Sequence, residues 1–145
     1  GKHHGRNDRG RAQYRPGSQS EAESLSATLF IGVAVLGGFG AVLRFLLDGA
    51  VSSRSKTSFP LGTMTVNLLG ALTLGVLLGA GISGDVLRIL ALGLLGSFTT
   101  FSTWIFETHR LGEDGRRRIA VANIAVSLLL GVAAVWVGKL IGGAL

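Results

Sequence analysis

The feature that most constrains this chain is a set of four long runs without a charged side chain. A bilayer core about 30 Å thick is crossed by roughly 20 apolar residues in a helix, and it tolerates few ions. Four runs of that length cannot all be buried in a water-soluble core of this size. The sequence therefore predicts an all-α membrane protein with four transmembrane helices. The runs are Ser24–Leu43, Thr57–Gly84, Ile89–Phe106 and Ile119–Gly138.

The first 25 residues differ from the rest in composition. They hold five basic, three acidic and only four apolar side chains, which is too few for a core. We expect residues 1–25 to form a disordered basic tail and residues 26–145 to form a four-helix transmembrane domain. The net charge of +6 and the pI near 11.1 could suggest nucleic acid, but the tail follows no nucleic-acid-binding pattern, so we expect no such partner.

Glycine, proline and polar residues set the expected helix ends. Pro60 suits a helix start because its missing N–H costs nothing there. Short connections make consecutive helices antiparallel neighbours. The expected helices are about Ser26–Asp48, Leu61–Ala80, Asp85–Thr108 and Arg117–Ile141.

Two pairs of glycines have the four-residue spacing that lets helix backbones approach closely. The pairs are Gly75 with Gly79 and Gly138 with Gly142. Glycine is also simply common in membrane helices. A monomer of four helices has little interior with which to line a pathway, so we expect self-association.

Positive charge is nearly balanced between the two sides of the predicted bundle. Seven Lys and Arg residues fall on each side. The five in the tail count less because most lie far from the first helix, which favours the side opposite the N-terminus as the cytoplasmic one. A bias this weak is compatible with insertion in both orientations, and two oppositely oriented copies could then pair.

The third run contains five hydroxyl side chains between Ser97 and Thr103, close to Gly93 and Gly96. Hydroxyls compete for backbone hydrogen bonds and glycine weakens a helix, so we expect this helix to be broken. Irregular backbone at membrane depth is tolerated where protein or a water-filled cavity covers it. The break therefore indicates an ion site or a pore. A regular helix whose hydroxyls bond their own carbonyls is the alternative.

The other polar residues in or beside the runs are mostly hydrogen-bond donors. Asn67 lies in the second run, and Asn123 and Ser127 lie one turn apart in the fourth. Arg44 directly follows the first run, and Asp48, four positions further on, is a possible salt-bridge partner. Amides, hydroxyls and arginine suit small anions, although helix-to-helix hydrogen bonding and a snorkelling arginine are the ordinary accounts.

Phe101 and Trp104 are three residues apart, so they share a helix face beside the hydroxyls. Ring edges carry partial positive charge and can face an anion, or the two rings can pack against a neighbouring helix.

The runs also exclude some functions. They contain no Asp, Glu, Lys or His, whereas proton-coupled transporters generally rely on an embedded ionisable group. This disfavours a small multidrug exporter, which needs a membrane-embedded glutamate. A non-transporting membrane assembly protein is the other alternative. The chain has no cysteine, so thiolate metal sites and cysteine nucleophiles are absent.

Three blocks of sequence together resemble the fluoride channel family, Fluc or CrcB, over nearly everything after about residue 30. The first block, residues 37–45, is similar to the family's Gly-Gly, Gly-Ala, Arg-Tyr pattern, with Phe45 in place of the tyrosine. The second, residues 59–70, holds Asn67. The third, residues 96–104, resembles the signature Thr-Thr-Phe-Ser-Thr-Phe, with Trp104 in place of the last phenylalanine.

The resemblance implies a passive channel of the plasma membrane, not an enzyme, that lets cytoplasmic fluoride leave the cell and so gives fluoride resistance. It implies an antiparallel, dual-topology dimer in the lipid bilayer, formed with a second copy or with a homologous subunit. It also implies a central sodium ion held by the backbone carbonyls of Gly96 and Thr99. The implied fluoride pathway comprises Asn67, Phe101, Trp104, Ser102, Thr103, Ser127 and Arg44.

Overall fold

The computed structural model describes the backbone of residues 16–145 and the side chains from residue 27 onward. Three helices are continuous: α1 (Pro16–Arg54), α2 (Leu61–Gly79) and α6 (Arg117–Gly143). The segment between α2 and α6 is divided. It consists of α3 (Gly84–Arg88), the π-helical η1 (Ile89–Leu95), α4 (Gly96–Phe98) and α5 (Phe101–Glu113).

Within the described residues, four helical stretches are long and apolar enough to cross a membrane, which confirms the predicted number of spans. Helix α1 begins earlier than expected, at Pro16, so residues 16–25 are helical where the composition predicted disorder. Residues 1–15 of the predicted tail lie outside the described residues. The third stretch extends to Glu113, beyond the expected end at Thr108.

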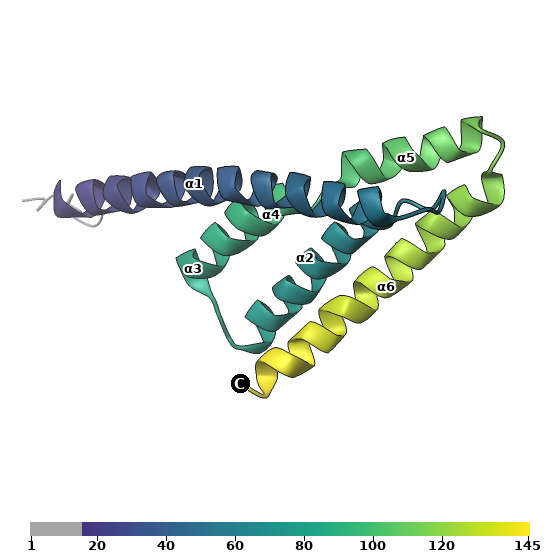
Figure 1. The fold of residues 1–145 in the computed structure, drawn as a ribbon. Helices are drawn as coiled ribbons and strands as arrows, with labels where there is room; N and C mark the ends of the chain where they lie inside the picture. The colour runs from purple at the N-terminus through teal and green to yellow at the C-terminus, as the bar shows by residue number, and fades with distance from the viewer. Residues whose placement is uncertain (1–15) are drawn as a thin grey trace, which may run out of the picture.

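Helices α2 and α6 run side by side (Figure 1), and glycines line the seam between them. A Cβ atom added at Gly75 would collide with the carbonyl oxygen of Val135, and one at Gly138 would collide with that of Leu72. Gly79 and Gly142 make equally close backbone approaches across the same seam. Both glycine pairs thus bring helix backbones together inside one chain, which confirms the close approach that their spacing predicted, while self-association stays a prediction.

Helix α1 packs against the first half of the third span, as Figure 1 shows. Gly40 of α1 lies so close to the Leu94 carbonyl oxygen that a Cβ would collide with it, and a Cβ on Gly93 would lie 3.0 Å from Val33 Cα. The second half of the span, α5, turns away from α1 and packs against α6 instead. The two halves therefore belong to different helix pairs, and the junction between them lies next to α2.

The interior is small and partly polar. Among the described side chains, those that are almost fully buried are Val66, Asn123 and Thr63. Large apolar side chains such as Phe30, Phe45 and Trp136 are mostly exposed. This is the reverse of a water-soluble fold, and it agrees with helices whose outer faces contact lipid or another subunit.

Candidate functional site

The third span is broken at two residues. Thr99 (φ −79°, ψ 159°) and Thr100 (φ −145°, ψ 124°) are extended between the end of α4 and the start of α5. The Thr100 hydroxyl caps α5 by accepting a hydrogen bond from the Thr103 backbone N–H at 3.2 Å. A hydroxyl at this position competes with the helical ladder because it offers the first turn an acceptor. The break predicted from the hydroxyl-rich stretch is confirmed.

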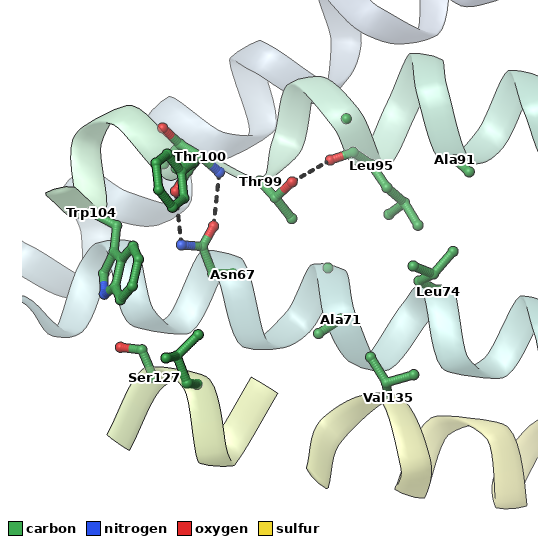
Figure 2. A pocket seen from close by; sticks show the side chains of 14 residues that line it. Asn67, Ala71, Leu74, Ala91, Leu95, Thr99, Thr100, Trp104, Ser127 and Val135 are labelled. Atoms are coloured by element: carbon green, nitrogen blue, oxygen red, sulfur yellow. Dashed lines mark hydrogen bonds between the residues drawn. The ribbon is translucent and has the colours of Figure 1, made fainter. Parts of the chain in front are cut away.

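Asn67 of α2 holds the break in place. Its Nδ2 donates to the Thr100 carbonyl oxygen at 2.9 Å, and its Oδ1 accepts from the Thr100 N–H at 2.8 Å. Figure 2 shows both bonds. The amide side chain thus replaces the two backbone partners that Thr100 would have in a continuous helix. An unpaired peptide group at membrane depth would cost several kcal/mol, so this pair is what makes the break tolerable.

Several carbonyl groups lose their usual helical donors at the break, and those of Gly96 and Thr99 are among them. In a continuous helix the Gly96 carbonyl would accept from the Thr100 N–H, and the Thr99 carbonyl from the Thr103 N–H. The Thr100 N–H donates to Asn67 instead, and the Thr103 N–H donates to the Thr100 hydroxyl. The carbonyls of Gly96 and Thr99 are the ones that the family resemblance assigned to sodium.

A groove of about 430 Å³ lies beside the break, between the third span, α2 and α6 (Figure 2). It brings together most of the residues singled out from the sequence. Those that line it are Asn67, Gly96, Thr99, Phe101, Trp104 and Ser127. The remaining lining is mainly apolar, from residues such as Leu74, Leu95 and Leu128.

Phe101 and Trp104 lie at the start of α5 and face the same side, as their spacing predicted. Their ring centroids are 5.5 Å apart and the planes are tilted by 57°. The two rings differ in burial, since Phe101 is 73% exposed and Trp104 is 8% exposed. Trp104 therefore belongs to the interior of the chain, while most of Phe101 faces outward.

A chain of hydrogen bonds links α5 to α6 behind the groove. The Ser127 hydroxyl donates to Asn123 Oδ1 at 3.3 Å, and Asn123 Nδ2 donates to the Thr108 hydroxyl at 2.8 Å. Thr108 in turn donates to the Trp104 carbonyl oxygen at 2.7 Å. Asn123 is fully buried and satisfied by this chain, so it positions Ser127 and α5 relative to α6.

Three predicted site residues do not line the groove. Ser102 and Thr103 lie at the first turn of α5, with their hydroxyls 3.4 and 3.0 Å from the Thr100 hydroxyl. Arg44 lies on α1, where its Nε is buried and makes no hydrogen bond within the described part of the chain. The salt bridge considered between Arg44 and Asp48 does not form, and Asp48 accepts from the Ser52 hydroxyl instead.

Sequence reasoning missed two polar residues at one end of the bundle. Glu107 Oε2 and Thr63 Oγ1 are buried and form no hydrogen bond among the described residues. Glu107 directly follows the third uncharged run, so the count of charges within the runs left it out. Its spacing of three residues from Trp104, on the same helix face, is the signal that could have found it.

The fold and the site together define a small multi-pass membrane protein with a polar break inside its third span. Residues 31–139 match the family model described as CrcB-like protein, Camphor Resistance (CrcB). The chain belongs to this CrcB family.

Curated relatives match this chain over most of their length. A protein named fluoride-specific ion channel FluC 2 of Mycolicibacterium paratuberculosis is 48% identical over 114 residues, which cover 79% of this chain and 93% of the relative. FluC 2 of Mycobacterium tuberculosis is 48% identical over 116 residues, or 80% of this chain and 92% of the relative. FluC 1 of Nocardia farcinica is 42% identical over 111 residues, or 76% and 78%.

Proposed function

We propose that this chain forms a fluoride channel that exports cytoplasmic fluoride passively across the cell membrane. Relatives that match it over most of their length carry the name fluoride-specific ion channel. The observation that carries the proposal is the convergence of Asn67, Phe101, Trp104 and Ser127 on one groove beside a broken membrane span. A passive pore suffices for this task, because hydrogen fluoride enters as a neutral acid, dissociates and leaves the anion trapped inside. The chain is therefore a channel and not an enzyme.

The groove offers a desolvated anion several partial positive charges. Asn67 uses one amide hydrogen for Thr100, which leaves the second for an anion. The edge of the Phe101 ring carries partial positive charge. The N-terminus of α5 lies at the break, and the dipole of a helix favours negative charge at that end. Ser102, Thr103 and Ser127 are the hydroxyl donors proposed along the route, and Arg44 would attract anions towards one end.

The carbonyls of Gly96 and Thr99 fit a structural sodium ion. Hard cations prefer oxygen ligands, and two carbonyls that have lost their helical donors are a suitable start for such a set. A bound cation would offset the electrostatic cost of placing an anion nearby. Two carbonyls are few for a sodium ion, so a second subunit would supply the remaining ligands.

We further propose that the active form is an antiparallel dimer. Phe101 lines the groove yet is 73% exposed, so the pathway is incomplete without a partner that covers this ring. The partner is a second copy or a homologous subunit. The numbers 1 and 2 in the names of the relatives fit a paired arrangement.

The distribution of charge bears on the choice of partner. One end of the bundle, where Arg116 of the α5–α6 turn donates to Ser58 of the α1–α2 loop, carries most of the basic residues of the described chain. Without the tail, this asymmetry favours one orientation, with that end in the cytoplasm. A chain fixed in one orientation needs a homologous subunit as its inverted partner. The basic residues on this side are Arg44, Arg54, Lys56, Arg110, Arg116, Arg117 and Arg118, against Arg88 and Lys139 on the other.

Fluoride efflux from proteoliposomes tests the function. We expect vesicles with the chain, alone or together with a homologous subunit, to release fluoride rapidly and chloride slowly. Phe101→Ile should slow fluoride efflux by about tenfold or more, because an aliphatic side chain has no positive ring edge to offer. Phe30→Ile is the matched control, since Phe30 is 76% exposed and lies on α1 away from the groove. The proposal would be refuted if vesicles retained fluoride both with the unmodified chain alone and with the chain together with a homologous subunit.

Replacing sodium tests the cation site. We expect protein purified and reconstituted with N-methylglucamine in place of sodium to lose fluoride efflux and to regain it when sodium is added back, because the Gly96 and Thr99 carbonyls would otherwise lack their cation. Equal efflux in both media would remove the cation from the proposal and leave the channel itself intact.

A further inference from the structure

A buried donor beside the groove has no acceptor within the described part of the chain. The indole of Trp104 lines the groove, and the residue is only 8% exposed. Its Nε1 makes no hydrogen bond among the described residues. A buried indole N–H usually has a partner. The arrangement therefore lacks an acceptor beside this ring.

The other side-chain donor groups around the groove donate to oxygen atoms of the chain. Each of four side-chain groups donates to a carbonyl or side-chain oxygen. They are Asn67 Nδ2 (2.9 Å) and the hydroxyls of Thr99 (2.9 Å), Thr100 (3.0 Å) and Ser127 (3.3 Å). In these four groups, the second amide hydrogen of Asn67 is the one that is left for a further acceptor. The Trp104 N–H is therefore the one side-chain donor group of this lining that has no hydrogen-bond partner among the described residues.

We propose that the Trp104 indole N–H donates a hydrogen bond to fluoride in this groove and helps to select it. This inference rests on the proposed function and names a chemistry for one of its residues. A hydrogen bond from N–H to an anion is stronger than one between neutral groups, and it is directional, unlike the diffuse positive edge of a ring. Fluoride is small and has a high charge density, so it gains more from such a donor than chloride does.

The burial of Nε1 adds a condition to this proposal. The atom is almost sealed from solvent in the structure, so the ion reaches it only when the indole or its neighbours shift. Trp104 is held on one side by the ring of Phe101 and through its carbonyl by Thr108. The side chain itself forms no hydrogen bond among the described residues that would resist this shift.

The indole resonances provide a test that does not depend on flux. The chain has two tryptophans, and Trp136 is 66% exposed on α6 and does not line the groove, so it is an internal control. In nitrogen-15-labelled protein in lipid nanodiscs, we expect sodium fluoride to move the Trp104 N–H proton resonance downfield in a saturable way. The Trp136 resonance should stay in place, and sodium chloride should move neither. An equal shift with chloride, or no Trp104 shift, would overturn the inference.

An isosteric replacement tests the donor in transport. Benzothienylalanine keeps the size and shape of tryptophan and replaces the N–H with sulfur. At position 104 we expect it to slow fluoride efflux by about tenfold, the usual effect of removing one hydrogen bond to an ion, whereas at position 136 it should leave efflux unchanged. Wild-type efflux with the isostere at position 104 would reject Trp104 as a donor while the fluoride channel stands. Vesicles of unmodified protein that retain fluoride would instead reject the channel, and the inference with it.

Discussion

The seam between α2 and α6 and the third span are both rich in small residues, yet one is regular and the other is broken. The seam has glycines that bring two backbones into contact while both helices stay continuous. The third span has glycines too, but its helix ends at Phe98 and starts again at Phe101. Small size alone therefore does not break a membrane helix.

The difference lies in competing hydrogen-bond partners. Across the seam, the groups that meet are glycine Cα atoms and carbonyl oxygens, which offer the backbone no alternative donor. At the break, Asn67 offers both a donor and an acceptor to Thr100, and the Thr100 hydroxyl offers an acceptor to Thr103. A helix at membrane depth can open where such groups replace the bonds that it gives up.

The largest effect is expected from a substitution that prevents the close approach of α2 and α6. Gly138→Leu puts a side chain where the Leu72 carbonyl oxygen lies, so α2 and α6 must separate. We expect a loss of about 3 kcal/mol or more in unfolding free energy, measured by unfolding in mixed detergent micelles. Gly131→Leu is the control on the same helix, because a Cβ there meets nothing within 4 Å. Equal stability of the two variants would show that the seam does not depend on its glycines.

A smaller effect is expected from removing the clamp on the break. Asn67→Ala leaves the Thr100 N–H and carbonyl without their partners, which should cost about 2 kcal/mol and slow fluoride efflux. Dimer assembly, followed by cross-linking, should be unchanged. Thr73→Ala is the control, since the Thr73 hydroxyl only bonds a carbonyl of its own helix. If both variants conduct alike, the break does not need its side-chain partner.

The smallest effect is expected at the cap of α5. Thr100→Val removes the acceptor for the Thr103 N–H, and we expect about 1 kcal/mol lower stability with a modest loss of efflux. Thr100→Ser keeps the hydroxyl and should retain both properties. A Val variant as stable as the Ser variant would mean that the extended backbone at residues 99–100 is set by Asn67 alone.

Much of the fold could be predicted because it depends on local composition. Uncharged runs of sufficient length must cross the bilayer as helices, and Pro60 fixes where α2 begins, at Leu61. The break could also be predicted, since five hydroxyls in seven residues are a local property. The extent of α1 could not, because the residues before the first run have little apolar surface and their helix continues one that is already formed.

The sequence predicted which residues belong to the candidate site, but it did not predict the hydrogen bonds that they form. The sequence indicated Asn67 and Ser127 as anion donors, whereas the structure shows that both already bond to the chain, to Thr100 and Asn123. Their part in binding fluoride stays a prediction. Glu107 was missed because its position just outside an uncharged run does not indicate that one of its carboxylate oxygens is buried in the folded chain.

The sequence by itself determined that this protein crosses a membrane four times and that its third span carries the polar groups, because transfer into lipid depends on the residues of each segment alone. Only the tertiary structure decided that Asn67 holds Thr100, that the glycines of α2 meet those of α6, and that Trp104 is buried while Phe101 is exposed. These choices depend on which surfaces meet across the bundle. Hydrogen bonds and close packing between residues far apart in the chain form only where both partners are brought to the right distance.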